Sequence, residues 1–242
     1  MFYYSFFDWT LVLLLPVLVF SFVAQFRVKR AFEWGSKTKT ACGITGAQTA
    51  RRILDENGLY HISIERVRGQ LTDHYSPKEC TIYLSEDVYD STSAAAVGVA
   101  AHEAGHAVQY AKDYFPIRIR TAIIPLTRIG STLAMPLFII GLMISYVFAY
   151  GPSPISDYLM VGGIALYSFC TLFQLITLPV EFNASRRALR TIDGWEIFSK
   201  DEYRVASQVL SAAAMTYVAA LASSLFSLLR LMLIFSGRRG RR

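Results

Sequence analysis

Long apolar segments alternate with short polar stretches along this chain. Four segments carry no charged side chain over nearly the length that crosses a bilayer, and these are Thr10–Phe26, Ile129–Ile155, Tyr158–Val180 and Val205–Leu229. About 20 apolar residues span the hydrocarbon core as a helix. The pattern therefore predicts a mainly α-helical membrane protein with three to four transmembrane helices.

The four apolar segments differ in what they predict. Residues 1–30 are expected to form an N-terminal transmembrane anchor, since no basic stretch or cleavage site of a signal peptide is present. The second and third segments are joined only by Gly151-Pro-Ser-Pro154, which predicts a transmembrane hairpin over residues 122–180. In the remaining region, 181–242, the segment Val205–Leu229 is rich in Ala and Ser, as tightly packed helices are. We expect a packed helix that continues into an interfacial segment around Phe226–Phe235, in preference to a fourth span.

Residues 31–121 have shorter patterns and predict a small folded α+β unit. Helical spacing runs from Ala47 to Asn57, just before Gly58. Alternating polar and apolar residues predict a strand at Tyr60–Val67, and a second short strand is expected at Cys80–Leu84.

Two further features complete this unit. Gly69 to Pro77 is polar and is expected to form a turn between the strands. Ser91 or Ser93 can cap an Ala-rich helix that extends to about Tyr110.

Composition and charge place the protein in a membrane. Hydrophobic residues make up 53% of the chain, and the net charge is +6. The basic residues cluster beside the apolar segments, which is typical of cytoplasmic loops and argues against nucleic-acid binding; these clusters are Arg27 to Arg30, Arg118 and Arg120, Arg186 and Arg187, and Arg238 to Arg242.

The charge positions also predict an orientation. The first nine residues are rich in aromatic side chains and carry no basic one, whereas Arg27 to Arg30 follow the first apolar segment. We therefore expect an integral protein of the plasma membrane with its N-terminus outside and the unit 31–121 in the cytoplasm. Three scattered cysteines, Cys42, Cys80 and Cys170, indicate neither a disulfide framework nor a cysteine zinc site.

The segment Ala100-Ala-His102-Glu103-Ala-Gly-His106 carries the candidate chemistry. Two His four residues apart lie on one face of a helix, so both imidazoles can reach one metal. Zinc acidifies water, and a neighbouring carboxylate can then take the proton and return it to a leaving amine. The motif predicts a zinc peptidase in which His102 and His106 bind the metal and Glu103 is the general base.

A catalytic zinc usually has three protein ligands. No His follows His106, so the third ligand does not come from a His shortly downstream. Glu181 is the better candidate, because it begins a helical stretch where the hairpin returns to the cytoplasmic side. His74 and Asp193 remain alternatives.

Three sequence motifs resemble the YugP-like family of zinc-dependent membrane peptidases: "LTDHYSP", "VAAHEAGHAVQ" and "LPVEFNASRRAL". That family is similar to the HtpX and CAAX-prenyl-protease gluzincins, in which a helix with two His precedes transmembrane segments and a helix with a Glu ligand. The resemblance implies a zincin-like unit, one zinc ion held by His102, His106 and Glu181, a catalytic Glu103, and a site that faces the cytoplasm.

One departure from the larger gluzincin group concerns the residues that orient the ligands. That group typically has Asp four residues after the Glu ligand, whereas this chain has Ser185 there and Asn183 two residues after it. Either can accept a hydrogen bond from an imidazole but brings no charge. Asp73 and His74, in the expected turn, are further candidates for a transition-state donor or a contact to a ligand.

Two other functions are compatible with parts of the sequence. An intramembrane site-two type protease would use Asp193 as a ligand, but charged residues flank both that segment and the His-bearing helix. A catalytically silent, zinc-stabilised scaffold or accessory subunit would not need Glu103. Expected partners are the lipid bilayer, a membrane-protein or peptide substrate, and either a membrane partner protein or a second copy of the chain.

Overall fold

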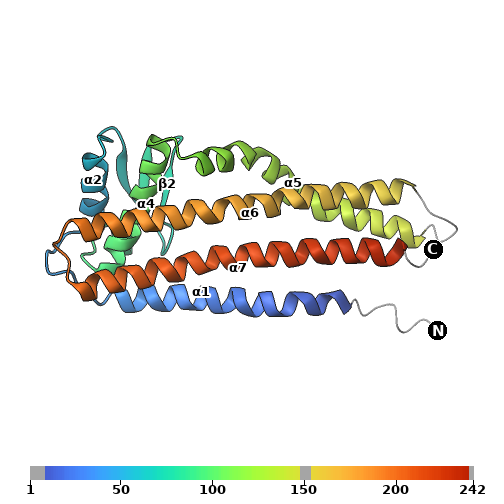
Figure 1. The fold of residues 1–242 in the computed structure, drawn as a ribbon, viewed down its shortest axis with the longest axis horizontal. Coiled ribbons are helices and arrows are strands. Elements are labelled where there is room, and N and C mark those ends of the chain that lie inside the picture. Colours follow the sequence, from blue (N-terminus) through green and yellow to red (C-terminus); the bar gives the residue numbers. More distant parts are fainter. Residues whose placement is uncertain (1–8, 148–153, 240–242) are drawn as a thin grey trace. The chain divides into compact units, whose positions relative to one another are not determined.

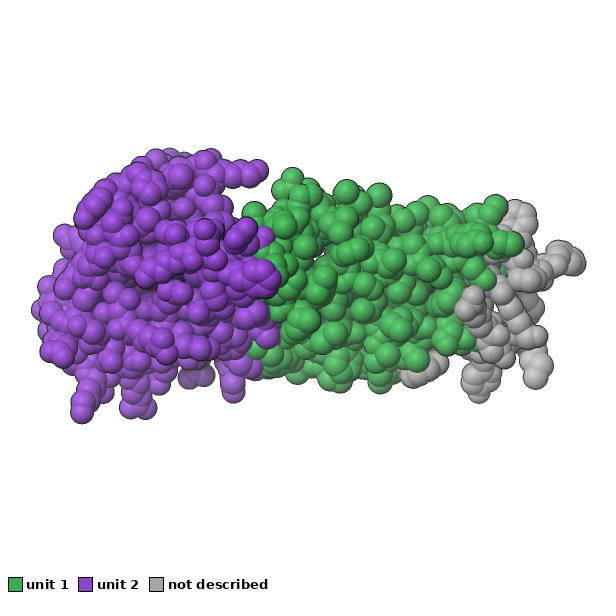
Figure 2. Space-filling model, turned by 45° about the horizontal axis from the view of Figure 1, so that its top comes forward, with its two compact units in different colours: residues 1–22, 119–177, 218–242 green, residues 23–118, 178–217 purple. Residues whose placement is uncertain are grey.

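A computed structural model describes residues 9–147 and 154–239, and two compact units divide it. One unit contains residues 1–22, 119–177 and 218–242, and the other contains residues 23–118 and 178–217 (Figure 2). We call them the helical unit and the site unit. The predicted turn at Gly151–Pro154 lies largely outside the described residues, as does most of the aromatic N-terminus.

Helices dominate the structure (Figure 1). A 3₁₀ turn, Trp9–Leu14, leads into α1 (Leu15–Gly35), and three longer helices follow later in the chain: α5 (Phe115–Val147), α6 (Pro154–Gly194) and α7 (Lys200–Arg239). All four helical segments are long and apolar enough to cross a membrane. This agrees with the upper end of the predicted number of spans.

α7 contains the segment in which we expected a packed helix that continues into an interfacial segment. The helix runs without a break from Lys200 to Arg239, so Val205–Leu229 and Phe226–Phe235 belong to one helix, and the interfacial position of its second half stays a prediction. No proline lies within it, and its Ala- and Leu-rich sequence has high helix propensity throughout. Its Ala- and Ser-rich first half and its Leu- and Phe-rich second half therefore form one helix.

Small residues bring the helices of the helical unit close together. A Cβ added at Gly130 would lie 2.6 Å from the Leu166 carbonyl oxygen, and one added at Gly163 would lie 2.7 Å from that of Ala134. Hydroxyl pairs link further helices, as where Thr171 Oγ1 lies 2.8 Å from Ser224 Oγ. Close packing of small residues with interhelical hydroxyl bonds is typical of helices in membranes.

The site unit contains a three-stranded sheet and three shorter helices. The strands are β1 (Ser63–Val67), β2 (His74–Ser76) and β3 (Thr81–Ser85), in the order β1-β3-β2. β3 pairs with β1 in parallel and with β2 in antiparallel fashion. The helices are α2 (Gly46–Glu56), α3 (Glu86–Tyr89) and α4 (Ala94–Ala111).

The expected polar turn at Gly69–Pro77 is wrong at its end, because His74–Ser76 forms β2. The local sequence is polar, but its backbone pairs with β3 and Tyr75 packs against the core. The other predicted elements are confirmed to within a few residues. α2 begins after Thr45, which forms a reciprocal capping box with Gln48, and the chain turns at Gly58 with a φ of 72°.

The core of the site unit consists of small and branched side chains. Ala100, Ala101 and Ala104 of α4 are fully buried, as are Leu54 of α2 and the β3 residues Ile82 and Leu84. Small side chains on α4 let neighbouring elements approach its backbone closely. α4 is therefore a buried helix on which polar side chains are held rigidly.

Candidate metal centre

α4 positions the two histidines of the motif. Ser93, one of the two capping residues expected from the sequence, caps the helix. Its side chain accepts a hydrogen bond from the Ala96 amide. One turn separates His102 from His106, and their ring centroids lie 4.7 Å apart. The helix thus presents both imidazoles on one side.

α6 brings Glu181 to the same point. Its Oε2 atom lies 3.3 Å from Nε2 of His102 and 3.3 Å from Nε2 of His106, and the Glu181 side chain is 2% exposed. These three residues are the one group in the described chain whose ligand atoms could hold a metal ion, and the atoms lie within 4.8 Å of one another. Neither His74 nor Asp193 belongs to the group.

The spacing of the three ligand atoms suits zinc. In a tetrahedral site with bonds of about 2.0–2.1 Å, neighbouring ligand atoms lie roughly 3.3 Å apart. Both Nε2-to-Oε2 distances have this value. Two imidazoles and one carboxylate also form a donor set typical of catalytic zinc, which keeps a fourth position open.

The outer nitrogens of both imidazoles have partners. His102 Nδ1 lies 3.1 Å from Ser185 Oγ, and His106 Nδ1 lies 2.9 Å from Gln109 Oε1. The Gln109 amide is fixed because its nitrogen donates to the Val180 carbonyl at 2.8 Å and to Asn183 Oδ1 at 3.0 Å. Its oxygen is therefore left to accept from His106, and this arrangement directs Nε2 toward the metal position.

The electrostatics of His106 follow from its surroundings. Burial lowers the pKa of this imidazole, but the hydrogen bond and charge of Glu181 more than offset burial, so the pKa lies above its ordinary value. Glu103 and Gln109 act in the same direction. The pocket around His106 therefore stabilises positive charge, whether a proton or a metal cation supplies it.

Glu103 lies beside the histidines on the wall of a cavity of about 230 Å³. Its side chain is largely buried. The cavity is also lined by His102 and Asp73, and by mostly apolar residues of α4 and α7, namely Val99, Val209, Leu210, Ala213, Thr216 and Tyr217. A carboxylate next to the candidate metal ligands thus faces a space with apolar walls.

Asp73 and His74 have different surroundings. Asp73 lines the cavity, and its Oδ1 accepts a hydrogen bond from the Ser85 amide at 2.7 Å. Burial raises the pKa of Asp73, the Ser85 hydrogen bonds oppose this, and the Glu103 charge adds to the rise. His74 is exposed, and its ring stacks on Tyr83 at 4.9 Å. The structure therefore brings Asp73, and not His74, to the cavity.

The two candidates after Glu181 also differ. Ser185 contacts an imidazole directly, whereas Asn183 reaches His106 only through Gln109. Sequence reasoning did not single out Gln109, although it lies three residues after His106 and so on the same side of the helix. It also missed Thr216 and Tyr217, which no local motif marks.

A close backbone contact fixes the spacing of α4 and α6 at this point. A Cβ added at Gly105 would lie 2.9 Å from the Ala184 carbonyl oxygen. Gly105 precedes His106 by one residue, and Ala184 follows Glu181 by three. The absence of a side chain at position 105 therefore allows the ligands of the two helices to meet.

Comparisons with known proteins point to zinc-dependent peptidases of membranes. The chain matches, over residues 10–236, a protein family described as "Putative neutral zinc metallopeptidase". It is 46% identical over 223 residues to a protein of Bacillus subtilis (strain 168) described as "Putative membrane protease YugP", covering 92% of this chain and 95% of that protein. No solved structure matches the chain significantly.

Proposed function

Because the chain belongs to this family of zinc metallopeptidases, we propose that it is a gluzincin-type zinc metalloendopeptidase of the plasma membrane, with its active site in the cytoplasm. The observation that carries the proposal is the meeting of His102, His106 and Glu181 beside a buried Glu103 that faces a cavity. One zinc ion per chain fits this donor set. Bound zinc would act as a Lewis acid that acidifies water and polarises a peptide carbonyl.

Each residue then has a defined task. His102, His106 and Glu181 hold the metal, while Ser185 and Gln109 fix the two imidazole rings through Nδ1. Glu103 accepts the proton of the attacking water and delivers it to the amine of the leaving peptide. Asp73 lies on the same cavity wall, where burial raises the pKa of its carboxyl and the Ser85 hydrogen bonds hold the side chain in place.

The mostly apolar lining of the cavity favours a substrate with an apolar side chain next to the cleaved bond. Val99, Val209, Leu210 and Ala213 offer it apolar contacts. α6, which carries Glu181, is also one of the candidate membrane spans, so the site and a span belong to one continuous helix. Membrane proteins, or peptides presented near the bilayer, are therefore the proposed substrates.

Replacing Glu103 by Gln tests the catalytic role. We expect the rate of cleavage of fluorescein-labelled casein by the full-length, zinc-loaded protein to fall by about 10²–10⁴-fold, because general acid–base catalysis contributes that much. Zinc content, measured by mass spectrometry, should remain one per chain. Glu65→Gln, at an exposed strand position, is the matched control and should keep full activity.

The opposite outcome has a clear meaning. If the zinc-loaded wild type cleaves neither casein nor a mixture of detergent-solubilised membrane proteins, the silent-scaffold alternative is favoured. If Glu103→Gln loses its zinc, the residue holds the metal and is not the proton carrier.

The native cysteines test the proposed orientation. Cys42 and Cys80 are exposed and both belong to the site unit. In the Cys170→Ser background, a membrane-impermeant maleimide should label the protein only after cells are lysed. The triple variant that also lacks Cys42 and Cys80 is the control for unspecific label. Strong labelling of intact cells would place the site unit outside.

A further inference from the structure

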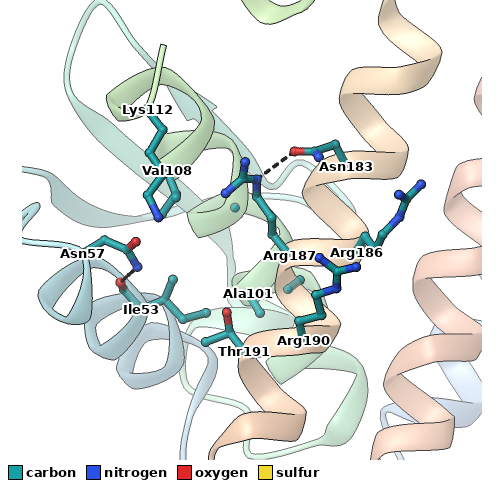
Figure 3. A pocket seen from close by; sticks show the side chains of 12 residues that line it. Ile53, Asn57, Ala101, Val108, Lys112, Asn183, Arg186, Arg187, Arg190 and Thr191 are labelled. Carbon is teal, nitrogen blue, oxygen red and sulfur yellow. Dashed lines mark hydrogen bonds between the residues drawn. The ribbon is translucent and has the colours of Figure 1, made fainter. Parts of the chain in front are cut away.

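A second cavity of the site unit shares no lining residue with the cavity at Glu103. It has a volume of about 270 Å³ and lies between α2, α4 and α6 (Figure 3). Its polar lining residues are Asn57, Lys112, Asn183, Arg186, Arg187, Arg190 and Thr191. We call it the basic pocket, because four of these side chains are cationic.

The charges of the basic pocket are not balanced by the protein. No Asp or Glu lines it, and none of its four cations forms an ion pair with a carboxylate of residues 9–147 or 154–239. Neighbouring α2 shows the opposite arrangement, since Arg51 and Arg52 pair with Asp55 and Glu56 four residues on. The three arginines of the pocket come from little more than one turn of α6. Such a cluster is stabilised by an anion.

The donors of the pocket are also positioned in advance. Arg187 is half-buried, and its Nε donates to Asn183 Oδ1 at 2.7 Å. In Figure 3 its guanidinium faces the cavity, which Lys112 and Asn57 enter from the other side and Thr191 from below. A guanidinium held by one nitrogen keeps its remaining N–H groups free to bind a phosphate in forked fashion.

We propose that the basic pocket binds a phosphate group, either of a free phosphate or of an anionic lipid headgroup. A topology signal alone would explain basic residues after a span, but it requires no cavity and no cation from another helix. Here Lys112, the residue that caps the C-terminal end of α4, joins the arginines of α6 around one space. The proposal is independent of zinc, although Asn183 also holds Gln109, the partner of His106.

The test uses the full-length protein in a neutral detergent and two probes, inorganic phosphate and phosphatidylglycerol. Calorimetry measures the dissociation constant of phosphate, and native mass spectrometry measures the retained phosphatidylglycerol against phosphatidylcholine. The test variant is Lys112→Gln/Arg190→Gln. Its control is Lys37→Gln/Arg204→Gln, which removes the same charge from two exposed residues of the site unit outside the pocket.

We expect the pocket variant to weaken binding of the probe at least tenfold and the control to change it less than twofold. Binding of phosphate by the wild type identifies a soluble anion as the source, and selective retention of phosphatidylglycerol without phosphate binding identifies a lipid headgroup. Either result supports the proposed phosphate site when the loss of binding is confined to the pocket variant.

The proposal is overturned if the wild type binds neither probe, or if both double variants lose equal affinity. Both variants should keep the wild-type melting temperature and zinc content.

Discussion

The α4–α6 helix pair has two faces of opposite charge. On one face, His102, His106 and Glu181 converge, and the adjoining cavity is lined by Glu103 and Asp73, with no Lys or Arg of the described residues. On the other face, Lys112 and three arginines surround the basic pocket, which no carboxylate lines in the part of the chain that the structure describes. The same two helices thus offer one site for a cation and another for an anion.

The difference between the faces lies in burial and in internal partners. We call the face with His102, His106 and Glu181 the metal face and the other the basic face. The polar groups of the metal face are largely buried, and protein atoms hold them in place, as Gln109 and Ser185 do for the imidazoles. The cations of the basic pocket, apart from Arg187, are exposed. A metal centre needs ligand atoms fixed to within tenths of an ångström, whereas mobile exposed cations suffice for a phosphate group. We therefore expect substitutions on the metal face to have the larger effects.

The largest effect is expected for Glu181→Gln. The neutral amide keeps the volume of a 2%-exposed side chain but removes the anionic ligand, so zinc affinity should fall at least about 100-fold, which corresponds to roughly 2.7 kcal/mol. Competition with a chromophoric chelator measures this. Arg190→Gln, on the basic face, should stay within twofold of the wild type. Loss of zinc from Asp193→Asn in place of Glu181→Gln would contradict the ligand assignment.

Smaller effects are expected for the partners of the imidazoles. Gln109→Leu removes the hydrogen bond to His106 from a fully buried position and should weaken zinc binding by about 10–100-fold. Ser185→Ala removes one longer bond at a partly exposed position, so its effect should be smaller than that of Gln109→Leu. The same chelator assay ranks the two. Thr191→Val on the basic face is the control, and equal losses in all three variants would indicate a general loss of stability.

Much of the metal face was predictable from the sequence because its signals are local. The spacing of His102 and His106 and the Ser93 cap act within one helix, and Glu181 was indicated by its place after an apolar segment. Gln109 was not indicated, since its role depends on where the Val180 carbonyl and Asn183 lie in space. The same holds for the basic pocket, which needs α2 and α4 beside α6.

One error in the predicted fold has a similar cause. β2 is polar in sequence and exists because β3 supplies its backbone partners, which no local pattern records. In α7, the composition changes at midlength, but the helix continues unbroken from Lys200 to Arg239, so the interfacial position expected around Phe226–Phe235 stays a prediction.

The close contact of Gly105 with the Ala184 carbonyl also bears on which ions the site accepts. The helix spacing that it sets leaves the nitrogen and oxygen donors 3.3 Å apart, a span suited to small divalent ions. Calcium prefers six to eight oxygen ligands, so a group of two imidazoles and one carboxylate is a poor match for it. By letting the two helices meet, a glycine without chemistry of its own brings together the mixed nitrogen and oxygen donors that favour zinc over calcium.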